Sequence, residues 1–438
     1  MRSSLVMTWK QKHQISSYLR ASMWMVPIAA MVLELVFVAV TFPFEHWLNW
    51  PGLRFGVEGA KALAGTVITL SLSFIVFTFG SLLVAIQVAS GQYTPRIIAT
   101  TLLRNNVIRF TVGLFVFALL FAVKALNHTS EDHVPELIIL VTGALGLACL
   151  AAFLFLIDYA ARLLRPVSLV RHVGEQGMIV INEVYPEKLD ATPAKEFRAQ
   201  DAGPVTRTIL HQGTSAIIVA VDVPRLVSEA RKANGVINLV PQVGDFVGTE
   251  EPLFDLHGGG AALKEEDLRD CVIFGSERTL EQDPLFALRV LVDIAIKALS
   301  AAINDPTTAV LAIDQLQRLL GRAGRRNLRT DQLLDETGTL RLIFRTPNWE
   351  DFVNLACCEI RACGAGNMQV ARRMRAMLVN LCEILPGVRQ RALCGQLELL
   401  DRMIEKLYLL PEDLALARIP DSQGLGGSTR MSLAKTPA

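Results

Sequence analysis

The chain has 438 residues, of which 51% are hydrophobic, and its mean hydropathy of +0.38 is higher than one soluble domain requires. The formal net charge is +1 and the basic residues form no long tract, which excludes an electrostatic case for nucleic-acid binding. Seven cysteines, scattered and odd in number, predict no disulfide framework.

Four apolar runs predict membrane-spanning helices. The second contains a long uncharged stretch between Lys61 and Arg96, which is enough to cross a bilayer as a helix. The first has no evident cleavage site, so we expect an uncleaved anchor helix. The runs extend from Ala21 to Phe44, from Gly59 to Arg96, from Val107 to Leu126 and from Val134 to Tyr159.

The distribution of basic residues predicts the orientation of these spans. The N-terminal segment and the loop after the second run contain basic residues and no acid, and arginines follow the fourth run. The two remaining loops are balanced or acidic. Because cytoplasmic loops carry an excess of lysine and arginine, we expect both termini in the cytoplasm.

The second run carries small and polar residues on one face. Thr66, Ser73, Gly80 and Gln87 recur at intervals of seven, and Thr69 falls in the same arc of a helical wheel. Such a face is typical of a packing seam, because small residues allow helices to approach closely in lipid. The alternative is that this face lines a water-filled pore formed by several copies of the helix. The sequence leaves both interpretations open.

Glu34 lies near the middle of the first run. A carboxylate at that depth is costly and is usually paired or in contact with water, which makes Glu34 a candidate functional residue. The alternative is a protonated or helix-paired side chain that faces the helix bundle.

After Arg165 we expect a β-rich domain over residues 166–260. Alternating apolar residues predict strands at residues 177–185 and 214–222, and residues 228–258 predict a strand, a turn and a strand. The G-D-F-V turn from Gly244 to Val247 resembles half of a biotinyl or lipoyl carrier barrel-sandwich. No lysine-bearing hairpin accompanies it, so the resemblance implies a scaffold without a cofactor. The glycine triplet at residues 258–260 is expected to be a linker.

Residues 261–420 are expected to form a mainly helical domain. Apolar residues recur at helical spacing over residues 285–299 and 310–320. Asp283 and Asp305 each precede a proline, which predicts two N-caps followed by proline at the first helical position. Asp293 lies one turn from both Arg289 and Lys297, which predicts an ion pair on the helix surface.

The same helices contain the polar residues that could form a cytoplasmic site. Carboxylates near a helix N-terminus could bind a divalent ion through oxygen ligands, although capping and ion pairing explain these residues without a ligand. The candidates are Asp283, Asp293, Asn304 and Asp305.

We predict no metal site and no cofactor. The five cysteines between residues 349 and 409 lack the spacing of zinc knuckles, and Val353, Cys357, Ile360 and Gly364 share one helical face, which favours core packing. The Gly/Ser-rich tail at residues 421–438 is expected to be disordered.

Several segments resemble a bacterial family of predicted integral membrane proteins, domain of unknown function 2254. The most specific are Q-Y-T-P-R at residues 92–96 and I-N-D-P-T-T-A-V at residues 303–310; S-M-W-M-V-P, G-D-F-V and G-S-E-R-T-L-E-Q-D-P support them. The resemblance covers nearly the whole chain. It implies a bacterial inner-membrane location and no established activity.

These features predict a multi-domain membrane protein with a four-helix transmembrane domain (1–165), a small barrel-sandwich-like β domain (166–260), a mainly helical cytoplasmic domain (261–420) and a tail (421–438). We expect a homo-oligomeric channel or transporter subunit in the lipid bilayer that passes small ions and has a cytoplasmic vestibule or regulatory module. A non-conducting membrane-anchored sensor or assembly scaffold is the alternative. A membrane-tethered enzyme is a third hypothesis, disfavoured because no G-x-S-x-G, H-E-x-x-H or Walker motif occurs.

Overall fold

The computed structural model describes residues 9–10, 12, 22, 24–48, 56–92, 106–130, 134–163, 165–189, 202–328 and 331–426. The chain divides into two compact units. The membrane unit comprises Ile15–Leu169. The extramembrane unit comprises Met1–Gln14 and Val170–Ala438.

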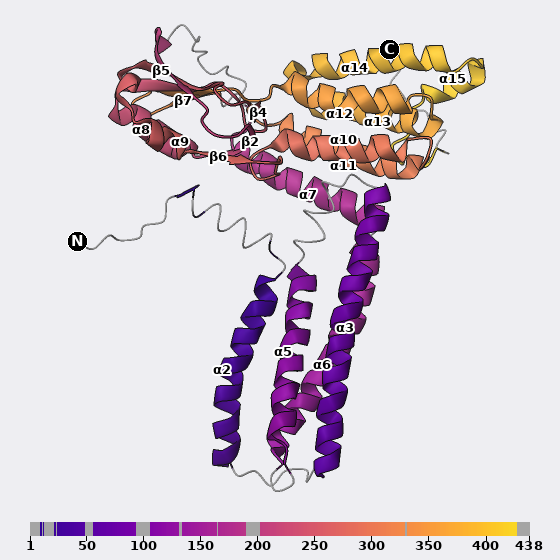
Figure 1. Ribbon diagram of the computed structural model, residues 1–438. Helices are drawn as coiled ribbons and strands as arrows, with labels where there is room; N and C mark the ends of the chain where they lie inside the picture. Colours follow the sequence, from indigo (N-terminus) through magenta and orange to yellow (C-terminus); the bar gives the residue numbers. More distant parts are fainter. Residues whose placement is uncertain are drawn as a thin grey trace. The chain divides into compact units, whose positions relative to one another are not determined.

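The membrane unit contains four helices that are long and apolar enough to cross a membrane. The predicted spans are therefore confirmed as helices, with boundaries close to those expected. Figure 1 shows them running alongside one another, and α5 is the most buried of the four. They are α2 (Met25–Leu48), α3 (Val57–Gln92), α5 (Asn106–His128) and α6 (Glu136–Leu163).

Aromatic stacking and close backbone approach hold these helices together. The rings of Phe74 and Phe153 stack with centroids 4.2 Å apart, and Phe115 lies 5.5 Å from Phe74, which joins α3, α5 and α6. A Cβ atom added to Gly113 would lie 2.9 Å from Cγ1 of Val26, so this glycine lets α2 and α5 approach closely.

The strand predicted at residues 177–185 is wrong, because this segment belongs to helix α7 (Pro166–Val184). Val170, Val173 and Val180 are buried, and a Cβ atom added to Gly177 would lie 2.9 Å from Cβ of Ala287. Their spacing is that of one helical face. A short apolar alternation does not exclude a helix, and only the longer window shows the helical repeat.

The described strands form two sheets. The five-stranded sheet has the order β1-β5-β3-β8-β7, in which β3 and β8 are parallel and the other pairs are antiparallel; the three-stranded sheet has the order β4-β2-β6. The strands are β1 (Val205–Leu210), β2 (Ala216–Val221), β3 (Gly235–Leu239), β4 (Phe246–Val247), β5 (Pro252–Gly258), β6 (Val272–Gly275), β7 (Gln332–Leu334) and β8 (Leu340–Phe344).

This mixed arrangement differs from the barrel-sandwich that the G-D-F-V turn predicted, and the sheets include three strands from beyond residue 260. Ile237 of β3 and Leu342 of β8 are fully buried in one core, which explains why these distant segments pair. The strand at residues 214–222 is confirmed as β2. The segment at residues 228–258, predicted as a strand, a turn and a strand, begins instead with the last residues of helix α8 (Val223–Lys232). Asp222 caps this helix.

The glycine triplet is not a linker. It ends β5 and begins a short 3-10 helix, η2 (Gly259–Ala262), before helix α9 (Glu265–Arg269). A Cβ atom on Gly259 would overlap the carbonyl oxygen of Ala233, and Gly260 is buried. Glycine is needed here because two backbone segments approach each other closely.

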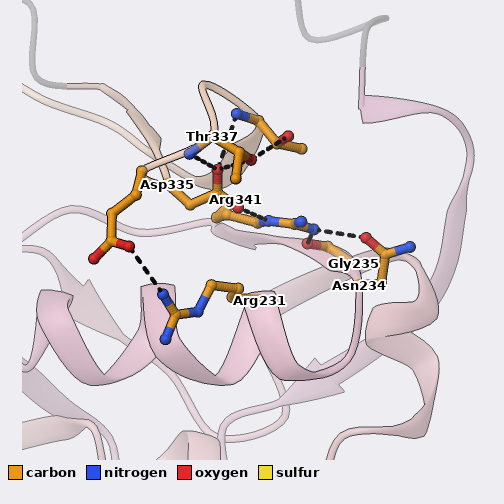
Figure 2. Close-up of polar contacts among 8 residues, drawn as sticks. Arg231, Asn234, Gly235, Asp335, Thr337 and Arg341 are labelled. Carbon is orange, nitrogen blue, oxygen red and sulfur yellow. Dashed lines mark hydrogen bonds and ion pairs between the residues drawn. The ribbon is translucent and has the colours of Figure 1, made fainter.

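A buried arginine attaches the β7–β8 hairpin to the start of β3 (Figure 2). Nε of Arg341 donates to Asp335 (2.7 Å), and Nη1 donates to Asn234 Oδ1 (3.1 Å) and to the carbonyl oxygen of Gly235 (3.3 Å). The hydroxyl of Thr337 and the Arg341 guanidinium hold the pKa of Asp335 well below its usual range. Because these groups satisfy one another, we assign the cluster a structural role.

The helical part of the extramembrane unit agrees with the sequence-based prediction. A break falls at Pro386, and the predicted core face of α12, which includes Val353 and Cys357, is buried. The helices are α10 (Pro284–Ala298), α11 (Pro306–Ala323), α12 (Trp349–Gly364), α13 (Met368–Ile384), α14 (Gly387–Leu407) and α15 (Pro411–Ala417).

The first part of the tail is ordered, so the prediction of disorder is wrong for residues 421–426. Asp421 is fully buried and accepts backbone N–H groups of Gly424 (3.1 Å) and Gly426 (2.7 Å). The buried guanidinium of Arg372 donates to the carbonyl oxygen of Gly426 (2.8 Å). Composition could not show this contact because it depends on a charged side chain of α13. Residues 427–438 lie outside the described residues.

Candidate functional site

The five candidate residues of α3 all lie on the face that the rest of the membrane unit leaves uncovered. Thr66, Thr69, Ser73, Gly80 and Gln87 are exposed, and a Cβ atom added to Gly80 would meet no atom within 4 Å. We call these residues the α3 stripe. The buried face of α3 consists of other residues, among them Ala60, Ala64, Val67, Phe74 and Leu82. Within the described part of the membrane unit, the stripe is therefore not a packing seam.

The hydrogen bonds of the α3 stripe are few. The hydroxyl of Thr66 donates to the carbonyl oxygen of Ala62 (2.7 Å), and that of Thr69 to Gly65 (2.9 Å). Ser73 makes no side-chain hydrogen bond among the described residues. Large exposed apolar side chains border the stripe: Leu72, Val76, Phe77 and Leu83.

Glu34 lies inside the membrane unit and not on the α3 stripe. Its side chain is only 2% exposed, and Oε1 has no hydrogen-bond partner in the described part of the chain. Phe37, one turn further along α2, packs on Phe121 of α5. Of the two interpretations of Glu34, the structure places it facing the helix bundle.

Glu34→Leu is expected to be nearly as stable as the wild type or more stable. Any loss in the free energy of unfolding should be less than about 1 kcal/mol. Oε1 loses no hydrogen bond, and an apolar side chain of similar size removes the cost of burying a polar group. Thermal unfolding of the full chain in detergent measures the difference. A loss of about 3 kcal/mol or more would show that the carboxylate holds a stabilising partner.

The two predicted N-caps are confirmed. Asp283 accepts the backbone N–H of Phe286 (3.1 Å) at the start of α10, and Asp305 accepts that of Thr308 (3.1 Å) at the start of α11. Proline occupies the first position of both helices. Nε of Arg289 donates to Asp293 (2.7 Å), which confirms the predicted ion pair on α10.

The four cytoplasmic candidates do not form one site. Asp283 precedes α10, whereas the N–H of Asp305 donates to the carbonyl oxygen of Ala298 (2.8 Å) at the other end of that helix. Asn304 is exposed with φ of +47° in the turn between α10 and α11. Among the described residues, no group of three or more His, Cys, Asp or Glu side chains could hold a metal ion. The structure therefore does not bring these four residues together as one set of ligands.

The sequence did not predict a buried ion pair that lies between the G-D-F-V segment and the G-S-E-R-T-L-E-Q-D-P segment. Nε of Arg278 lies 3.2 Å from Oδ2 of Asp283, and the Asp283 side chain is almost completely buried. Gly244 of the G-D-F-V turn has φ of +93°, and a Cβ atom there would lie 2.5 Å from Oδ2 of Asp283 and overlap Nη2 of Arg278. The turn thus packs directly on the ion pair. The sequence did contain a signal for this contact, because both segments are among those that resemble the family.

Burial raises the pKa of Asp283 to about 6, and the Arg278 charge opposes this rise. A raised folded-state pKa means that the folded state binds the proton more tightly than the unfolded state. The stabilisation that comes from this tighter binding of the proton is fully present below about pH 4 and is lost as the pH rises through 6.

We therefore compare the free energies of unfolding of the wild type and Asp283→Asn at pH 4 and pH 7. Between these two values, the variant is expected to gain up to about 3 kcal/mol relative to the wild type. Asparagine retains the N-cap acceptor, so the comparison isolates the titration. Urea unfolding of the full chain across this range measures it. A difference that is constant with pH would contradict the raised pKa.

The fold and these sites define the class of protein: four helices able to span a membrane, followed by a large extramembrane unit with mixed sheets and a helical region. The chain belongs to the family of predicted membrane proteins described as domain of unknown function 2254, whose family model matches residues 20–380.

Two relatives are uncharacterised proteins of Mycobacterium tuberculosis (strain H37Rv) and Mycobacterium bovis. Each is 27% identical to this chain over 402 residues, covering 87% of this chain and 74% of the relative. No solved structure matches the chain.

Proposed function

We propose that the protein is a subunit of an oligomeric channel or transporter of the bacterial inner membrane, with the extramembrane unit as its vestibule or regulatory module. The exposure of the α3 stripe carries this proposal. A face with hydroxyl and amide groups, left uncovered by its own chain, is suited to meet equivalent faces of other copies.

The length of the α3 stripe supports a continuous path. Thr66 and Gln87 are separated by 21 positions of one uninterrupted helix, which corresponds to about 31 Å at a helical rise of about 1.5 Å per residue. The hydrocarbon core of a bilayer is about 30 Å thick. The large apolar residues beside the stripe, such as Leu72 and Phe77, would pack copies together while the stripe faces the central axis.

The start of the chain supports termini on one side of the membrane. Trp9 packs against Val219, Ala220 and Ile273, and Nζ of Lys10 lies 3.8 Å from Asp270. The segment before the first span therefore contacts residues that follow the fourth, and such a contact requires an even number of spans between them. Together with the basic loops, this supports cytoplasmic termini.

Cysteine cross-linking tests the contact between copies. With the native cysteines replaced, Ser73→Cys and Gly80→Cys are expected to form disulfide-linked dimers in membranes upon oxidation. Leu147→Cys on α6 is the matched control, because Leu147 is also exposed but lies on another helix. The same membranes should yield protein that conducts ions in liposomes. Equal cross-linking at residues 73 and 147, or none at either stripe position, would contradict the proposal.

A non-conducting membrane-anchored sensor or scaffold is the second candidate. The hydroxyls of Thr66 and Thr69 bond to carbonyl oxygens of their own helix, which lowers the cost of placing this face against lipid. The mass of the detergent-solubilised protein separates the candidates, since a monomer cannot form a pore shared between copies.

A further inference from the structure

The extramembrane unit contains a cavity of about 800 Å³ to which neither the sequence nor the proposed channel assigns a role. Its walls come from α10, α12, β7 and the segments that follow β3, β6 and β8. This volume lies in the range of small-molecule sites, about 300–1,000 Å³, and suits a ligand of nucleotide size.

The cavity lies at the carboxyl ends of two parallel strands. Gln242 follows β3, and Arg345 and Thr346 follow β8, its parallel neighbour; all three residues line the cavity. The chain then enters α12, whose N-cap residue, Asn348, also lines it. The carboxyl ends of parallel strands and the N-termini of the following helices are where open α/β sheets bind their ligands.

Three arginines line the cavity, and two of them form ion pairs with carboxylates outside the cavity wall. Arg278 is held by Asp283, and Arg289 is held by Asp293 and Glu359; none of these three carboxylates belongs to the cavity wall. Such anchoring orients a guanidinium group before a ligand arrives. The carboxylates orient these two arginines but also neutralise their charge. The net positive charge that attracts an anion must therefore come from the third arginine.

Arg345 supplies that group. It is exposed in the cavity wall and has no hydrogen-bond or ion-pair partner among the residues that the structure describes. All five N–H donors of its guanidinium group are therefore available. A planar fork of donors matches a phosphate group in a bidentate manner, which a lysine does not.

The remaining wall specifies the other part of the ligand. The carboxylates of Asp331 and Asp351 and the amide of Gln242 can accept hydrogen bonds from hydroxyl or amino groups, whereas Leu285 and Phe344 offer apolar surface. We infer that this cavity binds a small phosphate ester that carries hydroxyl or amino groups, either a nucleoside phosphate or a sugar phosphate. This inference is independent of whether the membrane unit conducts ions.

Thermal unfolding of the full-length protein in detergent tests the inference. The probes are ATP, glucose 6-phosphate and inorganic phosphate, with adenosine and glucose as unphosphorylated counterparts. At a concentration of about 100 times Kd, ATP or glucose 6-phosphate is expected to raise Tm by about 5 °C or more, and the counterparts are not. A response to ATP alone assigns a nucleoside phosphate, and a response to glucose 6-phosphate alone assigns a sugar phosphate.

Variants locate the binding to the cavity. Arg345→Gln is expected to weaken binding about tenfold or more, because it removes charge-assisted hydrogen bonds to the ligand. The substitution breaks no hydrogen bond or ion pair among the described residues, so the fold should be unaffected. Arg391→Gln, an exposed arginine on α14 outside the cavity, makes the same charge change and is expected to bind like the wild type. Leu355→Trp fills the cavity and is expected to abolish binding by steric exclusion.

Three results would overturn the inference. They are a wild-type protein that binds none of the phosphate esters, equal binding of the unphosphorylated counterparts, and equal weakening by Arg345→Gln and Arg391→Gln. The last result would show a general charge effect and no site in the cavity.

Discussion

Gly244→Ala is expected to lower the free energy of unfolding of the extramembrane unit by about 3 kcal/mol or more. An alanine at φ of +93° costs about 1 kcal/mol or more by itself. Its Cβ would also overlap Arg278 and press on Asp283, so that the ion pair must separate and a buried carboxylate loses its cation. Denaturant-dependent thiol labelling of Cys271, which is fully buried in the adjoining β core, measures the opening of this region.

Gly338→Ala is the matched control for Gly244→Ala. Gly338 has φ of +77°, but a Cβ atom there would meet nothing within 4 Å. This variant should show only the backbone cost of about 1 kcal/mol. If both variants lose the same stability, the contact between the G-D-F-V turn and the Arg278–Asp283 pair contributes nothing, and our account of that turn is wrong.

Ser73→Asp is expected to leave the oligomer intact and to raise cation flux in liposomes severalfold. In a water-filled path the new carboxylate is solvated, and a ring of negative charge concentrates cations. If the α3 stripe instead faces lipid or a dry contact between copies, the same carboxylate is desolvated at a cost of several kcal/mol and the assembly should fail. Size-exclusion chromatography and flux assays on one preparation distinguish these outcomes.

Two further variants control the Ser73 experiment. Leu72→Asp places the same charge about 100° around α3, where we expect an apolar contact, and it should prevent assembly. Gly80→Leu should reduce flux in an intact oligomer by narrowing the path. The channel proposal fails if the wild type gives no flux above empty liposomes and Ser73→Asp prevents folding.

Local chemistry made a large part of the fold predictable. The four spans follow from uncharged runs long enough for a bilayer, and α10 and α11 follow from their apolar period and from Asp283 and Asp305 before prolines. The strand predicted at residues 177–185 failed because a few alternating residues fit a helical face as well as a strand.

The sequence by itself determined the membrane class of this protein, the positions of the four spans, the starts of α10 and α11 and the composition of the α3 stripe. Each of these depends on neighbours within a few helical turns. Only the tertiary structure decided that the stripe faces away from its own bundle and that β8 pairs with β3, about a hundred residues earlier. It also decided that Arg278 meets Gly244 and that Arg345, in the wall of a cavity, has no partner among the residues that the structure describes. These features arise from the burial and pairing of segments that are distant in the chain, and the periodicity of a single segment carries no information about its partners.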